Sequence, residues 1–153
     1  MRLLFLAVVL VAVGCGPQIV YESTQEVGDS WAYEEQLLFD FDISDTATVY
    51  QLEFELSHST DYPYQNLYVK VGTTYPDGHL ASDVVSLSVA DKRGEYYGEC
   101  SGSECMLPIQ LHERFRFQQL GRHQISIEQH SRTVDLSDVY GGTLRLVVAE
   151  TKK

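Results

Sequence analysis

The sequence has 153 residues and a formal net charge of −11 at pH 7, from 22 acidic and 11 basic residues. A body this acidic repels phosphate backbones, and no basic cluster interrupts it, so we expect no nucleic-acid partner. The same charge argues against electrostatic adhesion to anionic lipid head groups. Simple solvation of the surface is sufficient to explain the acidic balance.

The first fifteen residues, M-R-L-L-F-L-A-V-V-L-V-A-V-G-C, have the pattern of a lipoprotein signal. Arg2 supplies a positive charge, residues 3–13 form an uncharged apolar run, and small residues precede Cys15. The run is shorter than the about 20 apolar residues that cross a bilayer. We therefore predict a signal peptide at 1–14, a lipidated Cys15 (palmitate or a similar acyl chain) with a short spacer at 15–18, and one domain at 19–153.

Alternation with period two begins at Trp31. Apolar residues share one parity over 31–43 and again over 50–56, and acidic residues occupy much of the other parity. This pattern is typical of strands that expose one face to solvent. Turn-forming residues at 44–46 separate the two segments, which favours antiparallel pairing between them.

Further strands are predicted at 67–71, 85–89, 109–117, 123–127 and 144–148, with turn signals such as P-D-G at 76–78 between them. No window has sustained helical periodicity, although 134–139 is compatible with one turn of helix. The predicted fold class is therefore all-β, a single antiparallel β-sandwich with jelly-roll-like connections.

Two cysteines remain if Cys15 carries lipid. Cys100 and Cys105 lie in C-S-G-S-E-C, and in an exported protein this spacing predicts a local disulfide. A metal site would need two further soft ligands nearby, and the neighbouring sequence has none.

The sequence offers no catalytic constellation. His123 and His130 fall on opposite parities, so we expect them to point to opposite faces and not to share a metal. G-x-S-x-G elbows and glycine-rich phosphate loops are absent. We expect a non-enzymatic protein without cofactor or metal. An envelope hydrolase stays open as an alternative that requires two carboxylates, or a histidine and a carboxylate, facing one cleft.

The ten tyrosines and one tryptophan are the more suggestive feature. Several lie in or beside predicted turns, at 62, 64, 68, 96 and 97. Aromatic rings at such exposed positions can form a platform for sugars or partner proteins. Packing within the core or across strands is the alternative that we favour for most of them.

Five segments form an ordered series of motifs: Trp31 followed by F-D-F-D-I, Y-P-Y-Q-N-L-Y-V at 62–69, and residues 87–98, 117–121 and 125–136. In this order they resemble the motifs of the gliding-motility lipoprotein family GldH of the Bacteroidetes. The first segment resembles its opening strand, the second its most recognisable segment, and the others its later motifs. The chain departs from them at Ser131, where methionine is common, and at His123, where an aromatic residue is typical.

The resemblance implies an envelope lipoprotein that is required for gliding and linked to type IX secretion, with no catalytic residue. It implies lipidation at Cys15, and it leaves the roles of five motif positions unknown: Tyr62, Pro63, Tyr64, Asn66 and Arg132. For Arg132, a buried ion pair is the interpretation that we favour over a partner contact.

We expect the periplasm-facing leaflet of the outer membrane, because residues 16–18 lack the acidic run that resembles a surface-export tag. The leading hypothesis is an accessory lipoprotein that binds other envelope, motility or secretion proteins. The alternative is a carbohydrate- or peptidoglycan-binding module that uses exposed tyrosines.

Overall fold

The computed structural model describes residues 16–149, which form eleven β-strands and no helix. The predicted signal peptide and Cys15 lie outside the described residues. The strands are β1 (Ile19–Glu26), β2 (Trp31–Ala32), β3 (Gln36–Ile43), β4 (Tyr50–Ser59), β5 (Asn66–Thr74), β6 (Leu80–Ser88), β7 (Glu99–Ser101), β8 (Glu104–Phe115), β9 (Gly121–Gln129), β10 (Asp135–Leu136) and β11 (Val139–Val148).

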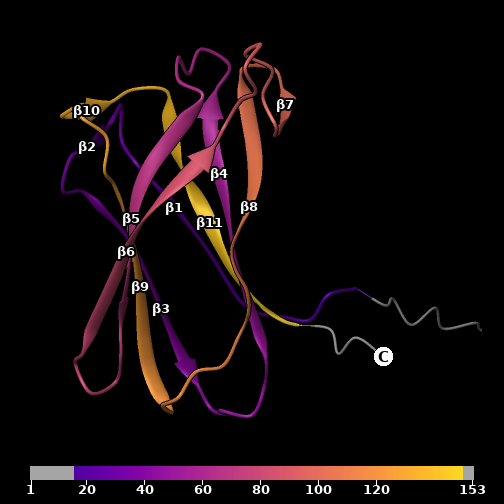
Figure 1. The fold of residues 1–153 in the computed structure, drawn as a ribbon, viewed down its shortest axis with the longest axis vertical. Coiled ribbons are helices and arrows are strands. Elements are labelled where there is room, and N and C mark those ends of the chain that lie inside the picture. Colours follow the sequence, from indigo (N-terminus) through magenta and orange to yellow (C-terminus); the bar gives the residue numbers. More distant parts are fainter. Residues whose placement is uncertain (1–15, 150–153) are drawn as a thin grey trace, which may run out of the picture.

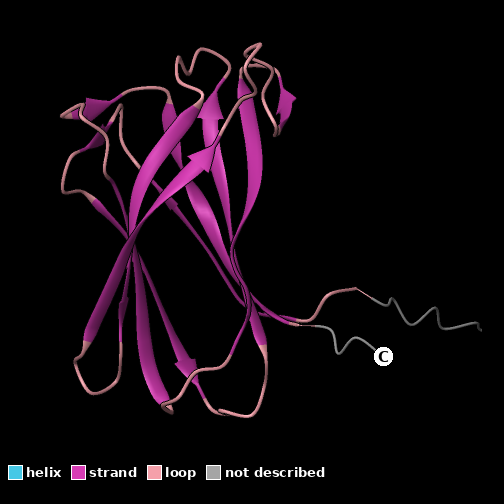
Figure 2. Ribbon diagram, viewed as in Figure 1, coloured by secondary structure: helices cyan, strands magenta, loops and turns pink. Residues whose placement is uncertain are grey.

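Two antiparallel sheets pack face to face, as Figures 1 and 2 show. The first has the strand order β1-β11-β4-β8-β7, and the second has the order β3-β9-β5-β6. A small two-stranded sheet, β10-β2, lies at the upper end of Figure 1. The predicted β-sandwich is therefore confirmed, and connections such as β3–β4 and β8–β9 pass from one sheet to the other, as they do in jelly rolls.

The core lies between the sheets and is built from alternating residues. The apolar parity of β3 and that of β4 are both buried, and the rings of Phe39 and Phe54 meet edge to face across the core, 6.5 Å apart. Gly142 of β11 lies where a Cβ would collide with the ring of Phe54, so this ring requires a glycine opposite it. The period-two pattern predicted this layer correctly for 37–43 and for 50–56.

The pairing predicted between 31–43 and 50–56 is wrong. β3 pairs with β9, whereas β4 pairs with β11 and β8 in the other sheet. Two consecutive amphipathic strands can bury their apolar faces against each other by lying across the core. Had they paired side by side, both faces would still have needed a cover, so the turn at 44–46 carries the chain between the sheets instead.

The segment 31–43 is also not one continuous strand. Glu34 has a φ of 77°, in the left-handed region, and the N–H of Glu35 bonds to the carbonyl of Ala32, which closes a turn between β2 and β3. As a result Trp31 is fully buried, while Tyr33 is 44% exposed. The turn of helix suggested at 134–139 is wrong as well, because β10 pairs there with β2.

The disulfide prediction is confirmed. Cys100 and Cys105 are bonded, and they are register partners in the hairpin of β7 and β8. The hairpin of β7 and β8 lies at the upper end of Figure 1. The disulfide joins the short edge strand β7 to β8 within one sheet, and it does not link the two sheets of the sandwich.

Candidate binding groove

One groove gathers most of the motif positions whose roles the sequence left open. A hollow of about 790 Å³ is bordered by the start of β5 and by the segment after β9. Its lining residues are Tyr33, Tyr62, Tyr64, Asn66, Tyr68, His130, Ser131, Arg132, Thr133 and Leu136. We call this hollow the tyrosine groove. Pro63 is exposed beside it and is not among the lining residues.

The floor of the tyrosine groove is buried and fixed. Tyr62 is 4% exposed, and its hydroxyl donates to the carbonyl oxygen of Asn66 at 3.2 Å. Burial raises the pKa of Tyr62 above its ordinary range, so the hydroxyl stays a neutral donor. The hydroxyl of Tyr96 lies 2.9 Å from the carbonyl oxygens of Tyr62 and Thr60, which holds the β4–β5 loop in place.

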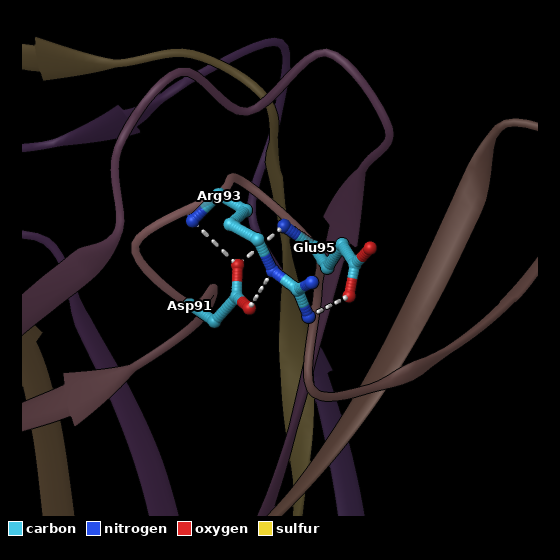
Figure 3. A network of polar contacts seen from close by, with 3 residues as sticks. All are labelled: Asp91, Arg93 and Glu95. Atoms are coloured by element: carbon cyan, nitrogen blue, oxygen red, sulfur yellow. Dashed lines mark hydrogen bonds and ion pairs between the residues drawn. The ribbon is translucent and has the colours of Figure 1, made fainter.

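Tyr96 directly follows a tight turn, across which it pairs with Ala90. Figure 3 shows the polar contacts of this turn. The carboxylate of Asp91 accepts hydrogen bonds from the backbone N–H groups of Glu95 and Arg93, and the Arg93 guanidinium bridges Asp91 and Glu95. The N–H of Glu95 and that of Arg93 hold the pKa of Asp91 below its ordinary value. The link between this turn and the groove floor through Tyr96 is visible only in the structure.

The far wall of the groove is built by a buried glutamine. Gln129 is 1% exposed, and its side-chain amide donates to the carbonyl of Thr133 at 2.9 Å. Its carbonyl oxygen accepts from the backbone N–H of Ser131 at 3.0 Å and from the hydroxyl of the same residue. Because a buried amide pays a large desolvation cost unless it is bonded, these contacts hold the loop 130–134 in one shape.

Sequence analysis did not assign Gln129 a role, although a signal was present. Gln129 shares the inward parity of Ile125 and Ile127, and a polar residue at a core parity predicts a buried hydrogen-bonded group. Nothing in the sequence indicated that its partners would be Ser131, Thr133 and Val134, in the loop that directly follows.

Arg132 is exposed and not a buried ion pair, so the interpretation favoured from the sequence is wrong. Within residues 16–149 it makes no hydrogen bond or ion pair, although Glu34 lines the adjoining hollow of about 620 Å³ with it. Other arginines are engaged: Arg122 pairs with Asp40 at 3.4 Å, and Arg145 pairs with Glu22 and Glu55.

The four tyrosines that line the groove differ in exposure. Tyr62 is buried, whereas Tyr33, Tyr64 and Tyr68 expose 44%, 50% and 48% of their surface. The rings of Tyr62 and Tyr64 lie nearly perpendicular, with 73° between their planes. The tyrosine groove is therefore lined by three half-exposed rings, one of which, Tyr64, is not coplanar with the buried Tyr62.

The histidines do not gather. His123 is fully buried, and His130 is exposed and lines the groove. No group of three or more His, Cys, Asp or Glu residues within 16–149 could hold a metal ion. The described residues also include no helix with the length and hydrophobicity that crossing a bilayer requires.

The alternative of an envelope hydrolase requires two carboxylates facing one cleft, and two carboxylates do line a smaller hollow of about 290 Å³. They are Glu26 and Glu104, and the hydroxyl of Ser57 donates to Glu104 at 2.5 Å. Both glutamates are exposed, and neither lies in the apolar surroundings that the general acid of a glycosidase requires. A histidine and a carboxylate, His123 and Asp40, also line a shallow hollow, but each bonds to other groups.

The fold and the groove define an all-β sandwich protein with a tyrosine-lined surface site, and the sequence relationships agree with the predicted family. The GldH lipoprotein family model matches residues 19–141, so this chain belongs to the GldH lipoprotein family.

Two relatives carry the same name. The chain is 24% identical over 129 residues to a gliding motility lipoprotein GldH homolog of Christiangramia forsetii, covering 84% of this chain and 79% of the relative. It is 25% identical over 130 residues to gliding motility lipoprotein GldH of Flavobacterium johnsoniae, covering 85% and 80%.

A structural relative shares only the fold. A family GH115 4-O-methyl-α-glucuronidase aligns with a TM-score of 0.50 and 10% identity, over 93% of this chain and 19% of that enzyme. At this identity the likeness concerns the β-sandwich architecture and carries no site residues.

Proposed function

We propose that this protein is an accessory lipoprotein of gliding motility, held in the outer membrane by lipid on Cys15, that acts by binding another envelope protein and not by catalysis. Family membership and the lipoprotein signal support the first part. The observation that carries the second part is the meeting of Tyr64, Asn66 and Arg132 in one groove. We include a link to type IX secretion, on which gliding depends in the family that the chain resembles.

The path of the chain bears on where the groove would face. Residues 16–18 reach about 10 Å if extended, and the eight residues of β1 then span about 26 Å. Figure 1 places the start of β1 and the end of β11 together in the lower half of the view, and β2 and β10 at the upper end. With Cys15 in the periplasm-facing leaflet, the tyrosine groove would lie on the side away from the membrane, within reach of periplasmic partners.

Deletion and complementation test the proposal. We expect deletion of the gene to abolish gliding and type IX-dependent export, and the double variant Tyr64→Ala with Arg132→Gln to fail in restoring them. Arg122→Gln is a matched control at the other end of β9, and it should complement fully. A deletion strain that glides and exports normally contradicts the proposal.

Cross-linking tests the contact directly. A photoreactive amino acid in place of Val134, which is exposed at the rim of the adjoining hollow, should capture one envelope protein in intact cells. The same group in place of Leu80, an exposed aliphatic residue at the start of β6, is the control. Equal capture from both positions would argue against a partner site at the groove.

Anchoring is tested by Cys15→Ala. This variant should leave the outer-membrane fraction, because the described domain would have lost its acyl chains. Continued sedimentation with the outer membrane would show that lipid on Cys15 is not the attachment.

A carbohydrate- or peptidoglycan-binding module is the second candidate, because three half-exposed tyrosines line the groove. Glycan-array or peptidoglycan pull-down binding that Tyr64→Ala abolishes would favour it. The perpendicular arrangement of Tyr62 and Tyr64 ranks it second, since sugar rings stack best on parallel faces.

A further inference from the structure

The charge of Arg132 is unusual for its surroundings. The chain carries a net charge of −11, yet within residues 16–149 this guanidinium has no carboxylate partner, and no carboxylate lines the tyrosine groove itself. Glu34 borders only the adjoining hollow, and it forms no ion pair with Arg132. The groove is thus a site of free positive charge on an acidic protein, which complements an anionic ligand.

The loop that carries Arg132 is preorganised: hydrogen bonds fix its conformation before any ligand binds. Gln129 bonds to the backbone on both sides of Arg132, at Ser131 and at Thr133. The N–H of His130 also donates to the carbonyl of Tyr68 at 2.7 Å, and the N–H of Tyr33 donates to that of Val134 at 2.6 Å. A loop fixed at these points loses little conformational entropy when a ligand arrives, which favours a recognition role for the side chain it presents.

The neighbouring groups indicate what accompanies the anion. Tyr64 and Tyr68 offer half-exposed rings, while Asn66, Ser131 and Thr133 offer hydrogen-bonding side chains. A guanidinium donates two parallel hydrogen bonds to a carboxylate. A polypeptide can supply such a carboxylate. The Tyr64 ring lies at 73° to the Tyr62 ring, an angled arrangement that matches branched or aromatic side chains better than a flat sugar face.

We propose that the tyrosine groove binds a peptide segment that carries a carboxylate beside an aromatic or aliphatic side chain, and that Arg132 is the residue that recognises the carboxylate. The proposal rests on the partner-binding function proposed above and names the chemistry of that partner. Tyr64 and Tyr68 contact the apolar side chain, and Gln129 is a positioning residue that holds Arg132.

A pair of matched probes tests this chemistry. N-acetyl-L-tyrosine carries a carboxylate, and N-acetyl-L-tyrosinamide is its neutral counterpart. The full mature chain, purified in detergent micelles, is titrated with each probe and followed by amide chemical shifts. We expect saturable shifts at 62–68 and 130–134 with a Kd in the millimolar range, and about threefold to tenfold weaker binding of the amide.

Three variants isolate the guanidinium. Arg132→Gln should bind both probes equally, which removes the preference for the carboxylate. Arg132→Lys keeps the charge but loses the planar fork, and it should recover only part of the preference. Arg122→Gln removes an arginine at the other end of β9 and should keep the full preference. Native-like amide spectra of each variant show that it is folded.

Four results would overturn the proposal. These are an absence of saturable shifts in the groove, equal binding of the two probes by the native protein, an equal effect of Arg122→Gln, and tighter Arg132-dependent binding of D-glucuronate, which would identify an acidic sugar as the ligand. Probe binding without any cross-linked partner at Val134 would instead contradict the proposed function and leave the carboxylate site standing.

Discussion

Each end of β9 has an arginine and a histidine close by, and the two ends use them differently. At its start, Arg122 pairs with Asp40, and His123 is fully buried against the rings of Phe41 and Phe117, at 6.1 and 4.6 Å. Beyond its end, Arg132 has no partner within residues 16–149 and His130 is exposed.

The difference lies in what the rings contact. At the start of β9 the rings pack on one another and on the buried His123, and they exclude water from the core. At the end they line an open groove, and a buried glutamine fixes the loop that presents the arginine. Similar residue types therefore contribute stability at one end and a binding surface at the other, and the predictions below separate these contributions.

The largest expected effect is at the closed end. Phe41→Ala removes a ring that packs against Tyr21, Phe117 and His123 and should lower the free energy of unfolding by about 3–5 kcal/mol, because the cavity cannot close. Tyr64→Ala at the open end should change it by less than about 1 kcal/mol. Urea denaturation of the purified variants measures both, and equal losses would contradict the division.

The next effect comes from the positioning residue. Gln129→Leu keeps the volume but removes the bonds to Ser131 and Thr133, and should cost about 1–3 kcal/mol. Amide hydrogen exchange at Ser131 should accelerate in the same variant. Gln124→Leu, on the outer face of β9, is the control and should stay within about 0.5 kcal/mol. Unchanged exchange at Ser131 would show that Gln129 does not hold the loop.

A smaller effect separates the two arginines. Arg122→Gln breaks an exposed ion pair and should lower the free energy of unfolding by no more than about 1 kcal/mol. Arg132→Gln breaks no contact within the described residues and should leave thermal unfolding unchanged. Destabilisation by Arg132→Gln in a thermal melt would mean that Arg132 has a structural partner.

The smallest effect concerns the exposed turns at the two ends. The backbone N–H of His79 and the Gln119 side chain hold the pKa of Asp77 below its ordinary value, as the N–H of Glu95 and that of Arg93 do for Asp91. Because these pKa values are lowered on folding, their contribution to stability is complete above about pH 4 and is lost as the pH falls through the lowered values.

Carboxyl chemical shifts followed during an acid titration measure this directly. Both aspartates should titrate below the ordinary value for an aspartate in a model peptide. Titration of Asp91 at the ordinary value would mean that its turn is not formed in solution.

Much of the fold was predictable because its signals are local. The alternation over 37–43 and 50–56 identifies the buried faces of β3 and β4, since successive side chains of a strand point to opposite sides. The spacing of Cys100 and Cys105 was enough for the disulfide, because five residues close a hairpin without help from the rest of the chain. β1 was not predicted, since its polar residues on both faces leave no clear period.

The candidate site was predictable only as a set of residues without roles. Tyr62 and Tyr64 are two positions apart and identical in type, yet one is buried and the other is half exposed. The side chains that line the groove with them, Arg132 and Leu136, are about seventy residues away in the sequence. The favoured role of Arg132 was wrong for the same reason, because its surroundings come from distant segments.

By itself, the sequence determined the class of this protein: an all-β domain whose strands, turns and disulfide follow from side chains and their near neighbours. Only the tertiary structure decided which strands pair, where the strand from Trp31 breaks at Glu34, and which tyrosines form a groove. The physical reason is that alternation specifies which face of a strand must be buried but not what buries it, and the covering residues come from elsewhere in the chain.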